Sequence, residues 1–485
     1  MNHRSLPFFV LLLFLASVWV VFDQRGVINI DGVLYLRQAN LFALGDVDAA
    51  RALYPWPFYG YFIALVHQLT GVSLQYSAQV INVSAFVLAA YFFLKTLQLI
   101  SDGQPVLWAG FLTLMTSIPL LDDYMPMLLR DNGMWAGFTA GLYFYLRWHQ
   151  VPTLLNSALS QFSFTLGALF RPELIIFNGL LPLASLFIRP AGLSRLRAGV
   201  MMGLLGILAL CAGLTYIGLQ YLNGGLSALD MGRLAELFER PRIVIENLLS
   251  PLPMTITTNY HFLHVMIDDH ALALKYIFIT YIVAYKWFAV VGLLHLSTAY
   301  LAVKHRLVRS EFLKPLLIVF VVSFAITAIN LPVSYVLSRR YWVMNLWVVY
   351  LFSALGFAFV IRELWQGAWK HLRWARLGFI AVVLGFALVV LFDSHRENDD
   401  LQAAAWIKSK GLLLDRTYIE DARLCFYLGR YDCGPADLEG AVGAGYPHLV
   451  LHLNRYQAPM EIEGYQLIKK LPDDRKPSFV VYQKQ

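Results

Sequence analysis

The chain is poor in charge and in cysteine. Lys, Arg, Asp and Glu make up only 14% of its 485 residues, against roughly 25% in an average soluble protein. Three cysteines are too few for a disulfide-stapled secreted scaffold. The net charge of +7 is not gathered into a separate basic segment, so nothing indicates a nucleic-acid partner. No small-residue cleavage pattern follows the first apolar run, 6–22, so we expect it to be retained as a signal anchor.

Long apolar runs dominate the sequence. Hydrophobic residues make up 58% of the chain, and runs of about 18 residues or more, long enough to cross a bilayer as a helix, recur along it. We therefore predict an α-helical polytopic membrane protein surrounded by membrane lipids. The shorter, interrupted segment 57–71 predicts a helix lying at the membrane surface. The eleven predicted spans are 6–22, 75–97, 105–120, 133–148, 154–170, 174–188, 199–222, 281–303, 314–331, 341–361 and 377–392.

Loop charge predicts the orientation of the chain. With a cytoplasmic N-terminus, the inner loops have a higher density of Lys and Arg than the outer loops, as the positive-inside rule requires. An odd number of spans then places the C-terminus outside. We predict a multi-pass protein of a bacterial inner membrane with a periplasmic C-terminal domain, although an endoplasmic reticulum protein would have the same topology. No inverted repeat is visible, which disfavours a transporter.

Two domains are expected. The first, 1–392, is the membrane domain, with a first outer loop at 23–74 and a long outer loop at 223–280. The second, 393–485, is a small soluble α/β domain, because alternating apolar residues are separated there by Gly and Pro turns. Its predicted elements are a helix at 399–410 and strands at 417–420, 447–453, 465–470 and 478–483.

The cysteines of the second domain leave two alternatives open. Only seven residues separate Cys425 from Cys433 on the predicted outer side, where an oxidising compartment would allow a disulfide. Two unpaired thiols are the other interpretation.

The most informative residue is Asp31, which directly follows the first span. Tyr35 and Arg37 accompany it, and the same loop ends in an aromatic-proline segment that contains Tyr54 and Trp56. A carboxylate in such a place can act as a general base. The alternative interpretation is that Asp31 caps a short interfacial helix.

A second acidic cluster, Asp122, Asp123 and Asp131, lies in the outer loop before the fourth span. Polar groups at membrane depth are costly and usually functional, so we expect at least one of these carboxylates to act in chemistry. Two alternatives stay open: Asp131 or Asn132 caps the following span, or Asp122 and Asp123 hold a divalent metal. No metal-ligand spacing is strong enough to predict a metal site, and no cofactor is firmly implied.

Basic residues mark two more outer turns. Arg171 precedes Pro172 and Glu173 between the fifth and sixth spans, and Arg339 and Arg340 precede Tyr341 at the start of the tenth. Guanidinium groups suit a phosphate ligand. The alternative interpretation is interfacial anchoring. A further phosphate candidate is Lys286, near the outer end of the eighth span.

These motifs, in this order, resemble the membrane glycosyltransferases of the GT-C superfamily, and most of all its protein-mannosyltransferase and aminoarabinose-transferase branch. The resemblance covers about residues 1–392 and the presence of an external terminal domain. It differs at Leu34, where the aminoarabinose branch has Arg, and at Asp31-Gly32, where the mannosyltransferases have Asp-Glu. The resemblance therefore does not specify the acceptor, which is left as a glycan, a lipid or a protein.

The resemblance implies an inverting transfer of a monosaccharide from a polyprenyl-phosphate carrier. Asp31, with Asp131, Asp122 or Asp123, would be catalytic, and Arg339, Arg340, Arg171 or Lys286 would bind the donor phosphate. The residues expected to contact substrate are Tyr35, Arg37, Tyr54, Trp56, Glu173 and Tyr341. The alternatives are a lipid-linked sugar flippase or transporter, and an enzyme of the O-antigen ligase or polymerase type.

Overall fold

The computed structural model describes residues 5–24, 28–101, 106–206, 208, 233–250, 261–334, 337–392, 398–412, 416–430, 437–453, 458–472 and 477–485. The chain forms two compact units. The first consists of Met1–Val21 and Gln79–Asp393, and the second of Phe22–Ala78 and Ser394–Gln485. The first outer loop is therefore grouped with the C-terminal domain rather than with the remaining helices.

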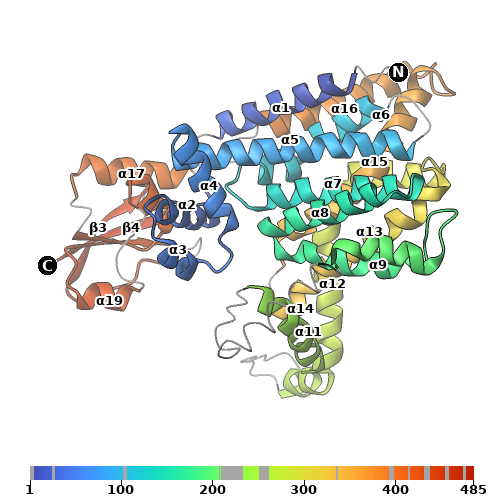
Figure 1. Ribbon diagram of the computed structural model, residues 1–485. Helices are drawn as coiled ribbons and strands as arrows, with labels where there is room; N and C mark the ends of the chain where they lie inside the picture. The colour runs from blue at the N-terminus through green and yellow to red at the C-terminus, as the bar shows by residue number, and fades with distance from the viewer. Residues whose placement is uncertain are drawn as a thin grey trace, which may run out of the picture. The chain divides into compact units, whose positions relative to one another are not determined.

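The first unit is helical (Figure 1). Its elements are α1 (Leu6–Asp23), α5 (Leu74–Ile100), α6 (Val106–Met115), the π-helical turn η2 (Ile118–Tyr124), α7 (Asp131–Gln150), α8 (Leu154–Phe170), the 3₁₀ turn η3 (Pro172–Leu174), α9 (Ile175–Ser185), α11 (Arg233–Leu249), α12 (His261–Lys304), α13 (Ser310–Ala328), α14 (Asn330–Ser334), the 3₁₀ turn η5 (Arg339–Trp342), α15 (Val343–Trp365) and α16 (Arg373–Phe392); α1 and α5 each extend a few residues into the second unit.

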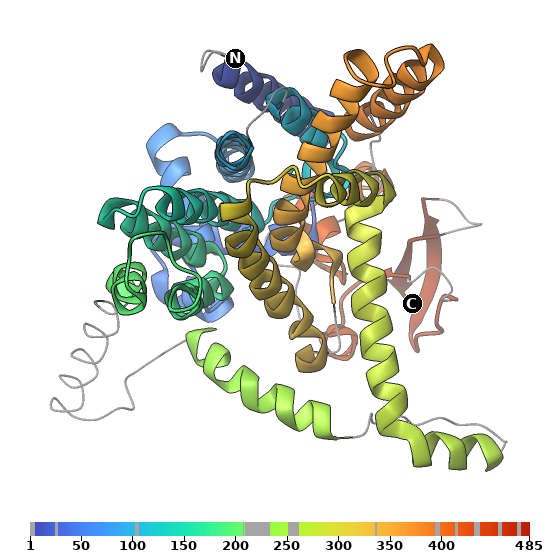
Figure 2. The ribbon, with the colours of Figure 1, turned by 90° about the vertical axis from the view of Figure 1, so that its right-hand side faces the viewer.

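The prediction of a polytopic helical protein is confirmed. Among the described residues, six helices are long and apolar enough to cross a bilayer, or seven if α6 and η2, which meet at 44°, form one broken span. The predicted spans at 133–148, 154–170 and 174–188 are also helices, although α8 and α9 are shorter than a full crossing. Most of the predicted span at 199–222 lies outside the described residues. Helix α12 begins at His261, well before the predicted residue 281, and bends at Gly292 (Figure 2).

Helix α15 lies at the centre of this unit. It packs against α6, α12 and α13, and most of its length is buried. Its Asn345 side chain is fully buried and is satisfied on both sides. The Nδ2 group donates to Phe320 O at 3.1 Å, and Oδ1 accepts from Trp287 Nε1 at 2.5 Å. Such bonds hold helices together where the surrounding lipid offers no hydrogen-bond partner.

The second unit combines a sheet with helices on both of its faces. Four strands, β1 (Thr417–Ile419), β2 (His448–His452), β3 (Tyr465–Leu471) and β4 (Phe479–Lys484), form a sheet of order β1-β2-β4-β3. Strands β1 and β2 are parallel, and the other pairs are antiparallel. Helices α17 (Asn398–Ser409) and α18 (Ala422–Tyr427) cover one face, and α19 (Leu438–Gly443) covers the other (Figure 1).

The predicted helix and all four predicted strands of this α/β domain are confirmed. The short helices α18 and α19 were not predicted. Cys425, on α18, is disulfide-bonded, while Cys433 lies outside the described residues.

The segment predicted as the first outer loop, 23–74, is mostly helical where the structure describes it. It contains α2 (Ile30–Ala43), α3 (Val47–Leu53) and α4 (Phe58–Thr70), and α4 matches the short helix predicted at 57–71. Helices α2 and α4 approach closely at Gly60, where an added Cβ atom would lie only 2.6 Å from Gln38 Oε1. The Gln38 Nε2 group donates to the carbonyls of Ala50 and Tyr54, each at 2.8 Å, which ties the three helices together.

Candidate functional site

The acidic turn of the first unit is built on a break in a helix. At the end of α6 the chain bends, and Ser117 caps the new turn by accepting a hydrogen bond from the Leu120 nitrogen at 3.2 Å. The same hydroxyl pairs with Tyr350 Oη of α15 at 2.8 Å. The turn that follows carries the buried Asp122 and the half-buried Asp123. Both carboxylates therefore lie on an element that is anchored to the centre of the unit.

A glycine ridge brings Asp131 and Arg171 together. Gly133, Gly137 and Gly141 recur every fourth residue along one face of α7, which packs antiparallel on α8. A Cβ atom at Gly137 would lie only 2.5 Å from the Cα atom of Gly167. Small residues at this spacing let membrane helices approach closely. The end of α8, where Arg171 follows, thus lies beside the beginning of α7, where Asp131 begins the helix.

Arg171 is held by two buried carboxylates. Its Nη1 donates to Asp131 Oδ1 at 2.7 Å, and its Nη2 donates to Glu173 Oε1 at 3.3 Å. All three side chains are less than a tenth exposed. Burial acts to lower the pKa of Arg171, but Glu173 and Asp131 outweigh it and hold that pKa above its ordinary value. The guanidinium is therefore charged and already compensated.

The turn η5, which carries Arg339 and Arg340, lies against the same group. The Tyr341 ring lies 4.7 Å from the Arg171 guanidinium carbon and 5.5 Å from that of Arg340. Asp123, Asp131, Arg339 and Arg340 all act electrostatically on the Tyr124 hydroxyl. Arg340 is half-buried and Arg339 is exposed. The structure thus brings together the predicted residues of three separate sequence motifs.

Lys286 lies elsewhere on the same unit. It is half-buried on α12, next to Trp287, and α12 packs against the turn η5 that carries the two arginines. Sequence reasoning did not select two further residues of the cluster, Tyr124 and the fully buried Asn132, whose Nδ2 donates to Met125 O at 3.3 Å. Asn132 directly follows Asp131 in the sequence, and this adjacency to a predicted site residue is the signal that could have identified it.

Asp31 belongs to the second unit. It is half-buried in the first turn of α2, where Asn29, not Asp31, occupies the N-cap position. Acidic residues are common in a first turn because the helix amides stabilise negative charge. One turn later, the buried Tyr35 ring packs edge-on against Tyr54 at 5.7 Å and against Tyr59 at 5.1 Å. Tyr59 is the aromatic member of this group that the sequence did not single out.

The other predicted residues of the loop also lie in this unit. Arg37 is half-buried on α2, and Trp56 packs edge-on against Phe58 at the start of α4, with ring centroids 5.3 Å apart. One folded segment of the second unit, from α2 to the start of α4, therefore carries all five predicted residues of this loop: Asp31, Tyr35, Arg37, Tyr54 and Trp56.

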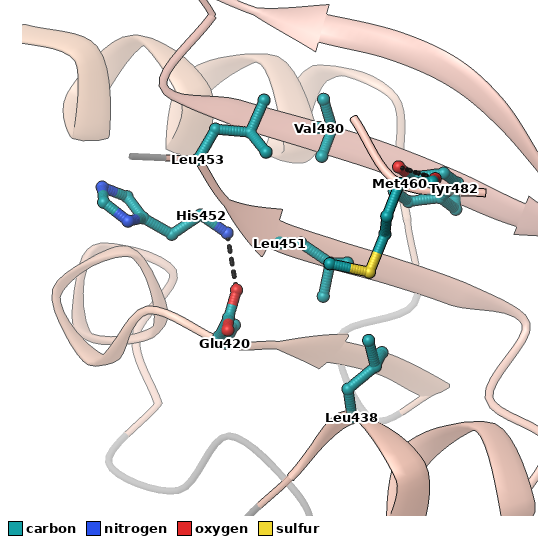
Figure 3. Close-up of a pocket in the computed structure, with 8 residues that line it drawn as sticks. All are labelled: Glu420, Leu438, Leu451, His452, Leu453, Met460, Val480 and Tyr482. Atoms are coloured by element: carbon teal, nitrogen blue, oxygen red, sulfur yellow. Dashed lines mark hydrogen bonds between the residues drawn. The ribbon is translucent and has the colours of Figure 1, made fainter. Parts of the chain in front are cut away.

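A cavity of about 230 Å³ lies in the C-terminal domain (Figure 3). It is bounded by side chains of β2 and β4, by Leu438 and by Met460. At the edge of the cavity, the Glu420 carboxylate accepts a hydrogen bond from the His452 backbone nitrogen at 2.8 Å. The lining residues are Glu420, Leu438, Leu451, His452, Leu453, Met460, Val480 and Tyr482. These residues include no lysine or arginine, so the cavity does not suit a phosphate.

Metal ligands do not gather in the described part of the chain. Within it, no group of three or more His, Cys, Asp or Glu side chains is arranged to hold a metal ion. The alternative of a divalent metal at Asp122 and Asp123 stays a prediction.

No protein-family model matches the sequence, and no curated protein matches it. The structure is similar to that of ArnT from Cupriavidus metallidurans bound to undecaprenyl phosphate, with a TM-score of 0.57 and 14% identity over 99% of this chain and 98% of that chain. The Archaeoglobus fulgidus oligosaccharyltransferase, tethered to an acceptor peptide containing the NVT sequon, gives a TM-score of 0.45 and 14% identity over 90% of this chain and 60% of that chain. A score of that size is too low to indicate a shared fold. The match to ArnT extends over nearly the whole of both chains, and the protein therefore shares the fold of that structure.

Proposed function

We propose that the protein is an inverting glycosyltransferase that moves a monosaccharide from a polyprenyl-phosphate carrier to an acceptor outside the cytoplasm. The observation that carries the proposal is the charged cluster of Asp131, Arg171, Glu173 and Tyr341, with Arg340 beside it. Burying such a group in an apolar helical unit costs free energy, and ionisable groups in such places are usually functional. The shared fold supports the same class, because ArnT was solved with undecaprenyl phosphate bound.

The reaction needs two kinds of group. The acceptor oxygen forms a bond to the anomeric carbon while the bond from that carbon to the carrier phosphate breaks. The phosphate leaves with the bonding electrons and gains one negative charge, which nearby cations stabilise. The acceptor proton passes to a carboxylate. Negative charge near the anomeric carbon also stabilises its oxocarbenium-like transition state.

We assign these roles to different residues. Asp31 takes the acceptor proton, since it follows the first span and lies half-buried in the first turn of α2. Arg339 and Arg340 receive the donor phosphate. Arg171 is compensated by Asp131 and Glu173, so its role is to fix these carboxylates and the Tyr341 ring. Tyr35, Arg37, Tyr54 and Trp56 then contribute to the acceptor side.

The phosphate assignment is tested by binding undecaprenyl phosphate to the full-length protein in nanodiscs. Because a hydrogen bond to a charged group contributes about 1.5–3 kcal/mol, Arg339→Gln and Arg340→Gln should each weaken binding about tenfold or more. The matched control is Arg373→Gln, which removes an exposed arginine at the start of α16. Unchanged affinity in both test variants, or an equal loss in the control, would remove the phosphate site from this turn.

A further inference from the structure

The C-terminal domain contacts the segment that leads into Asp31. The backbone nitrogen of Ile28 donates a hydrogen bond to Tyr427 Oη at 2.7 Å, and Ile28 is buried. Tyr427 is the last residue of α18, and α18 packs against α2. Both partners belong to the second unit, so this contact joins two distant parts of the chain within one folded body.

Tyr427 is presented by a well-anchored element. The Asp421 side chain caps α18 by accepting from the Arg423 and Leu424 nitrogens at 2.8 and 3.1 Å. The Lys408 ammonium of α17 donates to the Tyr427 carbonyl at 2.8 Å. Leu424 and the disulfide-bonded Cys425 are buried in the core beneath α17. These contacts hold α18 on the domain core, and they therefore fix the position of the Tyr427 hydroxyl that accepts from Ile28.

The bond acts close to Asp31. Ile28 is followed by the N-cap residue Asn29, whose side chain does not cap the helix, although its carbonyl accepts from the Val33 nitrogen at 3.1 Å. The direction of the first turn of α2 depends on where the incoming backbone is held. A proton acceptor must be held within about half an ångström of its working position, and small misplacements cost large factors in rate.

We propose that Tyr427 is a positioning residue for Asp31, and that the C-terminal domain serves catalysis by holding the first turn of α2 through this hydrogen bond. The inference rests on the proposed function, in which Asp31 takes the acceptor proton. It assigns the external domain a role in the transfer step without placing any reacting group in that domain.

The test compares Tyr427→Phe with Tyr465→Phe in the full-length protein. Each change removes one hydroxyl that makes a hydrogen bond of 2.7 Å within the same unit. The Tyr465 hydroxyl donates to the Tyr446 carbonyl, whereas the Tyr427 hydroxyl accepts from the segment before α2. We expect hydrogen–deuterium exchange of the amides at 28–33 to become about fivefold faster in Tyr427→Phe, since a net hydrogen bond contributes about 1 kcal/mol. Tyr465→Phe should leave these amides unchanged.

Two functional readouts separate positioning from general stability. Undecaprenyl phosphate should bind equally well to both variants. Carrier-linked sugar should accumulate in cells with Tyr427→Phe, to a level between those of wild type and Asp31→Asn, and not in cells with Tyr465→Phe. Equal exchange in the two variants overturns the proposal. So does faster exchange without accumulation when Asp31→Asn does accumulate the lipid. If Asp31→Asn accumulates none, the proposed function itself fails, and the positioning role fails with it.

Discussion

At the scale of single residues, the site depends on one compensated cation. Arg171 bridges Asp131 and Glu173 in a place where all three side chains are withdrawn from solvent. A buried ion pair adds little over an apolar replacement, but the loss of one partner leaves an uncompensated charge. The cluster is therefore sensitive to any change that removes charge from one side only.

Asp131→Asn is expected to destabilise the protein by about 3 kcal/mol, because Arg171 then keeps only one ionised partner in a buried place. The measurement is the melting temperature of the purified protein in nanodiscs. Glu246→Gln is the matched control, since it breaks the exposed pair between Arg242 and Glu246 at 2.6 Å and should leave the melting temperature unchanged. A similar small effect of both substitutions would show that the Asp131 pair is not buried in the membrane-embedded protein.

The residues of this cluster were predictable one by one, but their convergence was not. Asp131, Arg171 and Tyr341 each stood out as a polar residue at an outer turn. Glu173 was predicted to contact substrate, and the structure places it against Arg171. The pairing depends on which helices pack together, and that information lies in the glycines of α7 and α8 rather than in the charged motifs.

At the scale of elements, the approach of α7 to α8 sets the geometry of the cluster. Gly137 faces the backbone of Gly167, and Gly133 and Gly141 face the rings of Phe170 and Phe164. Because Asp131 and Arg171 lie at adjoining ends of these helices, a wider helix separation would pull the ion pair apart.

Gly137→Ala should therefore weaken both stability and function. The added Cβ would meet the Gly167 Cα at 2.5 Å and the Ser163 carbonyl oxygen at 2.7 Å, and overpacking of this kind costs about 2 kcal/mol. Gly179→Ala on α9 is the control, because its Cβ would meet nothing within 4 Å. The measurements are the melting temperature and the affinity for undecaprenyl phosphate of each variant. Equal behaviour of the pair would mean that the helices can separate at no cost to the site.

Elements with a clear apolar pattern were predicted well from the sequence, and those without one were not. The strands of the C-terminal domain alternate apolar and polar residues between turn signals, which explains their recovery. Helices α18 and α19 have six residues each, too few to show a helical period. The early start of α12 at His261 was missed because its first turns carry His and Asp residues, which read as a solvated loop.

At the scale of the whole molecule, the fold places the segment predicted as the first outer loop in one unit with the C-terminal domain. Composition predicted a membrane part and a soluble part, but it gave no indication that α2 to α4 pack with the end of the chain. That association depends on contacts such as the one between Ile28 and Tyr427, which connect residues nearly four hundred positions apart and leave no periodic trace in the sequence.

The whole-molecule claim is that the chain consumes a polyprenyl-phosphate-linked sugar and that Asp31 is required for this. The most direct measurement is lipid mass spectrometry on cells of the source organism that carry wild type or Asp31→Asn at equal protein levels. We expect a polyprenyl-phosphate monosaccharide to accumulate in the Asp31→Asn cells, because transfer stops while the donor is still made. An unchanged lipid pool together with unchanged surface glycans would contradict it and would favour transport of the lipid over transfer of the sugar.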